Sequence, residues 1–382
     1  MEKHMTGSNT PQIVINGLLM SGSATYRSAG ISTYISNLVA NLHPDSTMVY
    51  HIVIGRNTQF PERPLPTSMP TFSTDSPVKR IIWEQFFLPT RLKYLNADIL
   101  HAPAFVGPLL ASCPQVITVH DLSFIRFPHF FRRYNRVYLN LMTGISCRRA
   151  ASVIAVSDFT AAEVNQLLGI PRSKIRTVYH GVDPKFKPLP DDEVQNFRRR
   201  RGLPDRFILF LGTLEPRKNI AQLIKAYAQL KDKRTHLVLA GAKGWYYGEI
   251  YKIVADLALQ NYVHFPGYVP AGDQALWYNA ATAFAYLSTY EGFGLPVIEA
   301  LACGVPTLTS TSSSLPEAAG DGALQAKCDD QDEIVGKLHL LLSDASIRQS
   351  LREKGLHHAR KFTWHSTATN TVKVYHEILA RH

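Results

Sequence analysis

Short runs of apolar residues alternate with longer mixed segments along most of the chain. The runs are rich in β-branched residues and are bounded by turn-forming residues, which favours strands over helices. They cover residues 12–15, 116–119, 153–156, 176–179, 207–211, 236–240, 263–265 and 283–287. Strands that alternate with segments of helical length are typical of α/β domains built on parallel sheets.

This rhythm is interrupted once, by a stretch rich in proline and charge between residues 185 and 204. The chain has 382 residues, about twice the commonest domain size, so we expect two doubly wound α/β domains. We predict an N-terminal domain over residues 1–187 and a C-terminal domain over residues 188–361. The last segment, 362–382, has the apolar spacing of a helix and could pack on either domain.

The composition is that of a soluble globular protein, with 45% hydrophobic and 19% charged residues. No apolar run approaches the roughly 20 residues that span a bilayer, and no secretory signal is visible, so we expect a cytoplasmic protein. The 4 cysteines form no CxxC pair, which argues against a zinc site or a disulfide framework.

The net charge of +11 is concentrated in the first half of the chain. Residues 1–190 hold 19 Lys and Arg against 10 Asp and Glu, whereas residues 191–382 hold 22 against 20. A basic and aromatic segment between Phe124 and Arg149 could contact an anionic lipid surface or a lipid-linked acceptor, or could be a solvated helix face. We do not expect nucleic acid as a partner. The cations of the segment between Phe124 and Arg149 are Arg126, Arg132, Arg133, Arg136, Arg148 and Arg149.

The most specific stretch of the sequence, residues 290–300, follows the apolar run 283–287. Gly292 and Gly294 lie in the loop that we expect after this strand, and Pro296 suits the first turn of a helix. The unpaired N–H groups at such a helix start bind anions, and glycines allow a phosphate to approach closely. We therefore predict an anion site at this helix start.

Two glutamates flank this loop, Glu291 before it and Glu299 after it. We place Glu299 in the first turn of the predicted helix, where its oxygens can accept hydrogen bonds from ligand hydroxyls. Two alternatives stay open for these acids. They could be the acid and nucleophile of a retaining hydrolase, or Glu299 could only cap the helix.

A second cluster, residues 212–219, follows the apolar run 207–211 and contains the neighbouring cations Arg217 and Lys218. Ligands of doubly wound sheets bind at the carboxyl ends of strands, where this turn would lie. Neither a P-loop nor a clean GxGxxG motif is present, so the usual signatures of nucleotide hydrolysis and dinucleotide binding are missing. The turn instead offers positive charge to a diphosphate.

Both clusters resemble the retaining glycosyltransferases of the GT-B fold that carry the E-x7-E signature, the family 4 type. The matching stretches read E-G-F-G-L-P-V-I-E-A from Glu291 and E-P-R-K-N from Glu215. Further similarity lies at residues 30–35, 119–124 and 156–160, so the resemblance covers nearly the whole chain. It implies two Rossmann-like domains that face each other across a cleft, with the last helix packed on the N-terminal domain.

The resemblance also implies roles for individual residues. Glu299 would bind the donor ribose, Glu291 and the adjoining loop amides would hold the transferred sugar, and His120 would face that sugar. Without the resemblance, a hydrogen-bonded core histidine at a strand end would be the favoured interpretation of His120. The expected catalytic residues are His120, Glu291, Arg217 and Lys218. The expected donor-binding residues are Gly30, Gly212, Arg217, Lys218, Glu291, Gly292, Phe293, Gly294, Leu295 and Glu299. Thr213 and Ala29 depart from the pattern of some family members, so phosphate contacts there are in doubt.

No metal or other cofactor is expected. Asp330 and Asp332 spell the DxD of metal-dependent glycosyltransferases, but they precede an apolar helical pattern. Acidic residues at a helix start are favoured by the helix dipole, and we interpret the pair in that way. A divalent ion is unnecessary if Arg217, Lys218 and the helix start neutralise the diphosphate.

The implied activity is retaining transfer of a hexosyl group to a glycan or lipid-linked acceptor. The motifs around His120 and Arg217 look most like the bacterial mannosyltransferase branch, which favours GDP-mannose as donor. The alternatives are a UDP-glucose-dependent transferase, a nucleotide-sugar epimerase or hydrolase of GT-B architecture, and a sugar-nucleotide-binding protein without activity. The acceptor and the linkage do not follow from the sequence.

Overall fold

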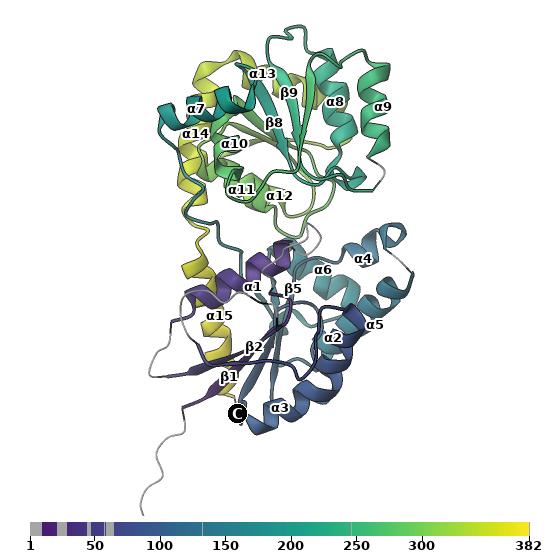
Figure 1. Ribbon diagram of the computed structural model, residues 1–382, viewed down its shortest axis with the longest axis vertical. Helices are drawn as coiled ribbons and strands as arrows, with labels where there is room; N and C mark the ends of the chain where they lie inside the picture. Colours follow the sequence, from purple (N-terminus) through teal and green to yellow (C-terminus); the bar gives the residue numbers. More distant parts are fainter. Residues whose placement is uncertain are drawn as a thin grey trace, which may run out of the picture. The chain divides into compact units, whose positions relative to one another are not determined.

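The computed structural model describes residues 10–20, 29–43, 47–56, 58, 65–131, 133–245 and 247–381. The chain divides into two compact units, each an α/β structure with helices around a sheet (Figure 1). The first unit comprises Met1–Tyr179 and Trp364–His382, and the second unit comprises His180–Thr363. The first division lies eight residues before the boundary expected after residue 187, and the second lies two residues beyond the boundary expected after residue 361.

The first unit is built on a seven-stranded sheet in the order β3-β2-β1-β4-β5-β6-β7. Every neighbouring pair is parallel. The strands are β1 (Gln12–Gly17), β2 (Val49–Ile54), β3 (Thr67–Ser68), β4 (Ile99–Ala102), β5 (Gln115–Val119), β6 (Ser152–Ala155) and β7 (Ile175–Thr177). The strand order reverses between β1 and β4, so the carboxyl ends of these strands form the point where doubly wound sheets bind ligands.

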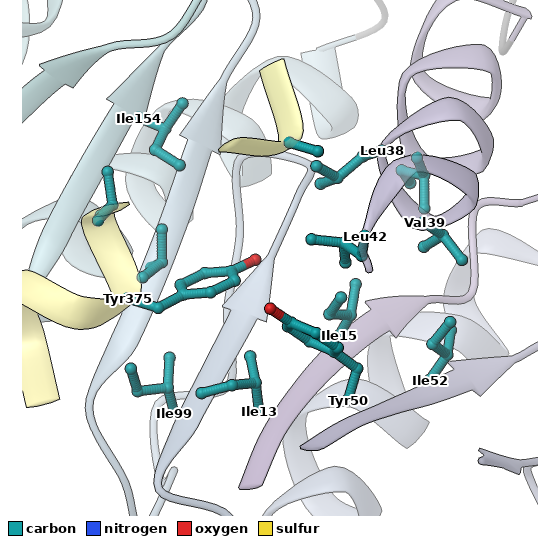
Figure 2. Packing of buried hydrophobic residues seen from close by; sticks show 14 of the residues in the cluster. Ile13, Ile15, Leu38, Val39, Leu42, Tyr50, Ile52, Ile99, Ile154 and Tyr375 are labelled. Carbon is teal, nitrogen blue, oxygen red and sulfur yellow. The ribbon is translucent and has the colours of Figure 1, made fainter. Parts of the chain in front are cut away.

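Helices cover both faces of this sheet. They are α1 (Ala29–Asn41), α2 (Pro77–Ile82), the π-helix η1 (Trp83–Phe87), α3 (Leu88–Tyr94), α4 (Ser123–Arg126), η2 (Pro128–Phe130), α5 (Arg133–Arg149), α6 (Asp158–Leu168), η3 (Arg172–Lys174) and α15 (Trp364–Leu379). The last of these, α15, comes from the end of the chain and belongs to the core of the first unit. Its Tyr375 packs among Ile13, Ile99 and Ile154 of the sheet, with Tyr50 nearby (Figure 2).

The second unit is built on a six-stranded sheet in the order β10-β9-β8-β11-β12-β13. All of its neighbouring pairs are parallel as well. The strands are β8 (Phe207–Leu211), β9 (His236–Ala240), β10 (Val263–Gly267), β11 (Ala283–Tyr286), β12 (Thr307–Ser310) and β13 (Ala323–Ala326). Its order reverses between β8 and β11, so the loops that follow these two strands occupy the ligand-binding edge.

The helices of the second unit include two that begin directly after these loops, α8 (Ile220–Gln229) and α11 (Leu295–Ala302). The others are α7 (Asp191–Arg201), η4 (Pro216–Lys218), α9 (Gly248–Asp256), α10 (Gln274–Ala280), α12 (Leu315–Ala319), α13 (Gln331–Ser343) and α14 (Ala345–Ala359). The prediction of two doubly wound α/β domains is therefore confirmed. Among the described residues, no helix combines the length and apolarity needed to cross a membrane.

Candidate functional site

The loops after β8 and β11 are joined to each other by hydrogen bonds. The backbone N–H of Thr289 donates to the carbonyl of Arg217 at 2.9 Å, and the Ser288 hydroxyl donates to the same carbonyl at 3.1 Å. The turn after β8 ends at Asn219, which has φ +56° and precedes α8. These contacts bring Arg217 and Lys218 against the loop that carries Glu291.

Lys218 and Glu291 form the centre of this site. The Lys218 ammonium contacts Glu291 Oε1 at 2.5 Å and donates to the Tyr286 hydroxyl at 2.8 Å. The Tyr286 hydroxyl in turn donates to Glu291 Oε1 at 2.9 Å. The side chains of Lys218 and Glu291 are 9% and 12% exposed. The three groups therefore form a nearly buried and fully hydrogen-bonded triangle, which holds the carboxylate in one position.

Arg217 extends the cluster. Its Nη2 lies 3.0 Å from Glu215 Oε1, and its Nη1 donates to the carbonyl of Tyr290 at 3.1 Å. Nη1 is also 3.8 Å from Glu291 Oε2. Each of the two cations is thus paired with a carboxylate in this structure. The turn offers a diphosphate less free positive charge than the sequence pattern suggests, and a bound phosphate would share Arg217 with Glu215 and Glu291.

These contacts shift the ionisation of both central groups. Burial lowers the pKa of Lys218, although the neighbouring Glu291 opposes that effect. Burial alone would raise the pKa of Glu291, but Lys218 and Arg217 outweigh it and bring this pKa to about 2. Glu291 is therefore a carboxylate throughout the physiological pH range.

The glycine loop before α11 requires its glycine at position 294. Gly294 has φ +102°, and a Cβ there would lie 2.7 Å from Leu315 Cδ2. The next side chain along, Phe293, is buried against the rings of His180 and Phe362, at centroid distances of 5.4 and 5.6 Å. Phe293 thus anchors the loop, and only its backbone is left to serve the expected donor contact.

The predicted start of α11 is confirmed in part. Pro296 stands in its first turn, and the helix ends at Ala302, with Cys303 as its C-cap and Gly304 following at φ +71°. The placement of Glu299 in the first turn is wrong, because α11 begins at Leu295 and leaves Glu299 one turn further on. At that position its carboxylate is too far along the helix to cap the free N–H groups.

Glu299 instead accepts a hydrogen bond from the Tyr278 hydroxyl of α10 at 2.9 Å. Burial raises its pKa to about 7, against the opposing effects of the Tyr278 hydrogen bond and of Lys185. Glu299 is therefore poised between its neutral and ionised forms near neutral pH, whereas Glu291 stays ionised. The two acids of the E-x7-E motif differ in environment and in charge.

His120 belongs to the first unit, where it follows β5. Its Nε2 lies 2.8 Å from the carbonyl of Pro103, which makes this nitrogen the donor. Its ring meets the ring of Tyr34 edge to face at 4.8 Å and that of Phe105 at 5.6 Å. Burial lowers the pKa of His120, so the imidazole is neutral at pH 7.

Two of the expected donor-binding glycines stand at turns. Gly30 is exposed in the first turn of α1, and residues 21–28, which precede this helix, lie outside the described residues. Gly212 follows β8, and its carbonyl lies so close to Gly241 that a Cβ on Gly241 would overlap it. Leu295 is the first residue of α11. Their roles in binding stay predictions.

The interpretation of Asp330 as a helix-start residue is confirmed. Asp330 is the N-cap of α13, and its Oδ1 accepts a hydrogen bond from the Glu333 N–H at 2.9 Å. Asp332 lies in the first turn of the same helix. Asp330 thus caps the helix, and Asp332 stands where the helix dipole favours a negative charge.

The basic and aromatic segment of the first unit is only partly available to a ligand. Phe124 is buried, and Arg126 forms an ion pair with the buried Glu163 at 2.6 Å. Arg132 lies outside the described residues. Arg133, Arg148 and Arg149 remain exposed on α5.

Sequence reasoning missed Tyr286, Tyr278 and Glu215, which bind the cations and acids of the site. Tyr286 and Tyr278 are fully buried in positions that the apolar pattern assigns to the core. Only the hydroxyl, which in each case donates to a glutamate of the site, distinguishes them from phenylalanine. Glu215 had a visible signal, because it opens the E-P-R-K-N stretch two residues before Arg217.

Comparison with known proteins covers both units. The family described as glycosyl transferases group 1 matches residues 191–358, and the family described as glycosyltransferase family 4 matches residues 28–186. The sucrose-phosphate synthase of Thermosynechococcus elongatus superimposes with a TM-score of 0.76 at 18% identity, covering 97% of this chain and 100% of that one. This likeness shows the fold.

Curated relatives share more of the sequence. The O-antigen chain mannosyltransferase B of Escherichia coli is 34% identical over 281 residues, which are 72% of this chain and 74% of that protein. The serotype-specific mannosyltransferase WbdA of Escherichia coli is 29% identical over 253 residues, 64% of this chain and 31% of that protein. Together with the strand-end cluster around Glu291, these matches show that the chain belongs to the GT-B glycosyltransferases of group 1 and family 4.

Proposed function

We propose that this glycosyltransferase moves a mannosyl group from GDP-mannose to a glycan or lipid-linked acceptor, with retention of configuration and without a metal ion. The observation that carries the proposal is the Lys218, Tyr286 and Glu291 triangle beside the start of α11. The mannosyl donor is supported by the activities named for its relatives in Escherichia coli.

The charges of this site fit the transfer of a sugar. Breaking the bond between the anomeric carbon and the diphosphate oxygen makes the sugar positive and the leaving group negative. The carboxylate of Glu291, which Lys218 and Arg217 keep ionised, can stabilise the sugar. Arg217, Lys218 and the N–H groups at the start of α11 can stabilise the leaving diphosphate, which is the task that a metal performs in other enzymes.

Retention would follow from attack on the face that the leaving group vacates. The acceptor hydroxyl oxygen forms the new bond to the anomeric carbon, the bond to the diphosphate breaks, and the acceptor proton passes to a phosphate oxygen. No protein nucleophile is needed. Because burial lowers the pKa of His120, its ring is neutral and can hydrogen-bond the sugar without placing a second cation beside the positive sugar.

A donor panel tests the proposal most simply. Thermal unfolding is followed with GDP-mannose, UDP-glucose, GDP and UDP, because a ligand that binds only the folded state raises its stability. We expect GDP-mannose and GDP to raise the Tm in the presence of EDTA. A rise with the uridine nucleotides alone would contradict the donor, and a rise that requires manganese would contradict metal independence.

Turnover separates transfer from epimerisation or hydrolysis. GDP release from GDP-mannose is measured with and without mannose-containing oligosaccharides. We expect release that depends on the acceptor, accompanied by a product one sugar longer. Equal release of free sugar in both reactions would contradict a transferase. We place the enzyme in the cytoplasm, at the inner membrane surface where the acceptor is lipid-linked.

A further inference from the structure

One continuous helical stretch of the first unit exposes a row of apolar side chains. Helix α2, the π-helix η1 and α3 follow each other from Pro77 to Tyr94. Val78, Ile82 and Phe86 are 54%, 42% and 68% exposed, and the neighbouring Phe87 is 46% exposed. Their spacing of four residues places the first three on one side of the helix. Rows of large exposed apolar groups mark interaction surfaces.

Helix α5 exposes a second row. Tyr134, Val137 and Leu141 are 65%, 53% and 59% exposed, and their spacing again selects one helix face. The elements that carry the two rows are neighbours in the first unit, because the loop at Gly107 binds both of them. Its carbonyl accepts from Gln85 Nε2 of η1 at 3.3 Å, and its N–H donates to Ser146 Oγ of α5 at 3.2 Å.

The charges around these rows have one sign. Lys79, Lys93 and Arg133 are exposed on the same elements. Residues 77–95 contain a single acid, Glu84, and residues 133–149 contain none. Glu84 is buried and accepts a hydrogen bond from Asn16 Nδ2 at 2.9 Å, so it does not offset the cations at the surface.

We propose that this surface docks the enzyme on an anionic lipid bilayer. It is named here the α2–α5 face and consists of Val78, Ile82, Phe86, Phe87, Tyr134, Val137 and Leu141 with Lys79, Lys93 and Arg133. Its apolar side chains enter the boundary between headgroups and acyl chains, and its cations meet anionic headgroups. A second copy of the chain is the poorer partner, because two such faces would bring like charges together.

The face differs from the membrane segment expected from the sequence. That segment ran from Phe124 to Arg149, and only its α5 part carries exposed apolar groups. The other half of the α2–α5 face comes from residues 78–87, where the sequence resembles an ordinary amphipathic helix. Docking by this face is independent of the proposed donor, since it uses no residue of the cluster around Glu291.

Vesicle sedimentation of the full chain tests the proposal. Phosphatidylcholine vesicles are compared with vesicles that also contain phosphatidylglycerol, at low and high salt. We expect binding to the anionic vesicles that weakens with salt, because charges at a surface are screened. The variant Lys79→Ser with Lys93→Ser should bind about 25-fold more weakly, since each lysine near such a surface contributes a factor of about five.

Matched variants of the second unit provide the controls. Phe86→Ser and Leu141→Ser should each reduce vesicle binding, whereas Tyr268→Ser, at a residue 64% exposed, should not. Lys225→Ser with Lys354→Ser changes the net charge equally and should leave binding intact. Equal binding to both kinds of vesicle, or equal losses in the control variants, would overturn the proposal. So would self-association that Phe86→Ser abolishes, which would assign the face to a second copy.

Discussion

Two chemically identical side chains of the site, Glu291 and Glu299, have opposite ionisation behaviour. Glu291 lies against Lys218 and Arg217, which hold its pKa at about 2 despite burial. Glu299 has a hydroxyl of Tyr278 as its close partner, and burial raises its pKa to about 7. Titratable pairs whose pKa values are pushed apart are typical of functional sites, and here they suggest different tasks.

Donor affinity should depend on pH through Glu299. If this side chain binds a donor hydroxyl, its ionised form is the stronger acceptor, so the Kd should fall as pH rises through about 7. Glu299→Gln should weaken donor binding by a factor on the order of ten and remove this pH dependence. Titration calorimetry of wild type and variant from acidic to alkaline pH measures both effects. Parallel profiles in the two proteins would argue against ribose binding by Glu299.

The same shift predicts how the stability of the protein without ligand changes with pH. The pKa of Glu299 is higher in the folded state than in the unfolded state, so the folded state binds more protons between these values. Its contribution to the free energy of unfolding therefore falls as pH rises toward about 7. Glu299→Gln should unfold at a higher temperature than wild type above this pH, and the gain should disappear at acidic pH.

Lys218 should support both stability and catalysis, and a double variant separates the two. Lys218→Ala leaves the carboxylate of Glu291 buried without its closest cation, which costs about 3 to 5 kcal/mol in comparable cases. We expect the second change, Glu291→Gln, to restore much of this stability by removing the charge. The rate constant should stay reduced by about 10²-fold or more in both proteins. Recovery of turnover in the double variant would remove both residues from the mechanism.

Among the secondary-structure elements, the strands that the sequence predicts best are those made of apolar residues. The runs 207–211 and 236–240 match β8 and β9, because five consecutive apolar side chains in the first and four in the second fit a strand buried on both faces. Strand β12 was missed, since it reads Thr-Leu-Thr-Ser. Its hydroxyls are nevertheless buried and bonded, with Thr309 Oγ1 donating to the Tyr286 carbonyl at 2.9 Å. A hydropathy pattern does not distinguish polar side chains that are hydrogen-bonded inside the fold from polar side chains that are exposed to water.

The conformation of the loop before α11 requires glycine at position 294. Gly294→Ala adds a Cβ 2.7 Å from Leu315 Cδ2 at a φ of +102°, so it should lower stability by more than about 1 kcal/mol and weaken donor binding. Gly267→Ala is the control, because its φ is +83° and nothing lies within 4 Å of its Cβ. Chemical unfolding of both variants is the measurement. Equal losses would show that backbone strain, and not the packing against Leu315, fixes this glycine.

Helix α15 is tied to the first sheet by a buried polar contact. The Tyr375 hydroxyl lies 2.6 Å from His101 Nδ1, and His101 Nε2 lies 2.8 Å from Thr118 Oγ1. Burial lowers the pKa of His101 to about 3, so the ring stays neutral. Tyr375→Phe should cost about 1 to 3 kcal/mol by leaving a buried ring nitrogen unpaired. Tyr94→Phe, at a residue 75% exposed, should leave the unfolding curve unchanged, and equal curves for both variants would contradict this account.

For the whole molecule, the rhythm of strands and helices was sufficient to predict two doubly wound units, since it depends only on local patterns. The two candidate sites at the strand ends could be predicted from the glycines and charged residues of their loops. The contact between the two sites could not be predicted, because Lys218 and Glu291 lie 73 positions apart in the sequence. The assignment of His120 rested on family resemblance, since a buried histidine at a strand end has no sequence signature of its own.

The stereochemistry of transfer tests the central claim most directly. Wild-type enzyme is incubated with GDP-mannose and mannose-containing oligosaccharides in EDTA, and the anomeric proton of the new linkage is observed by NMR. Intact-mass spectrometry with a fluorosugar donor is run in parallel, because a covalent intermediate would appear as an adduct on Glu291 or Glu299. The account predicts a mannosylated product with the anomeric configuration of the donor and no adduct. An inverted product, an adduct on either glutamate, or transfer only after a metal is restored would contradict it.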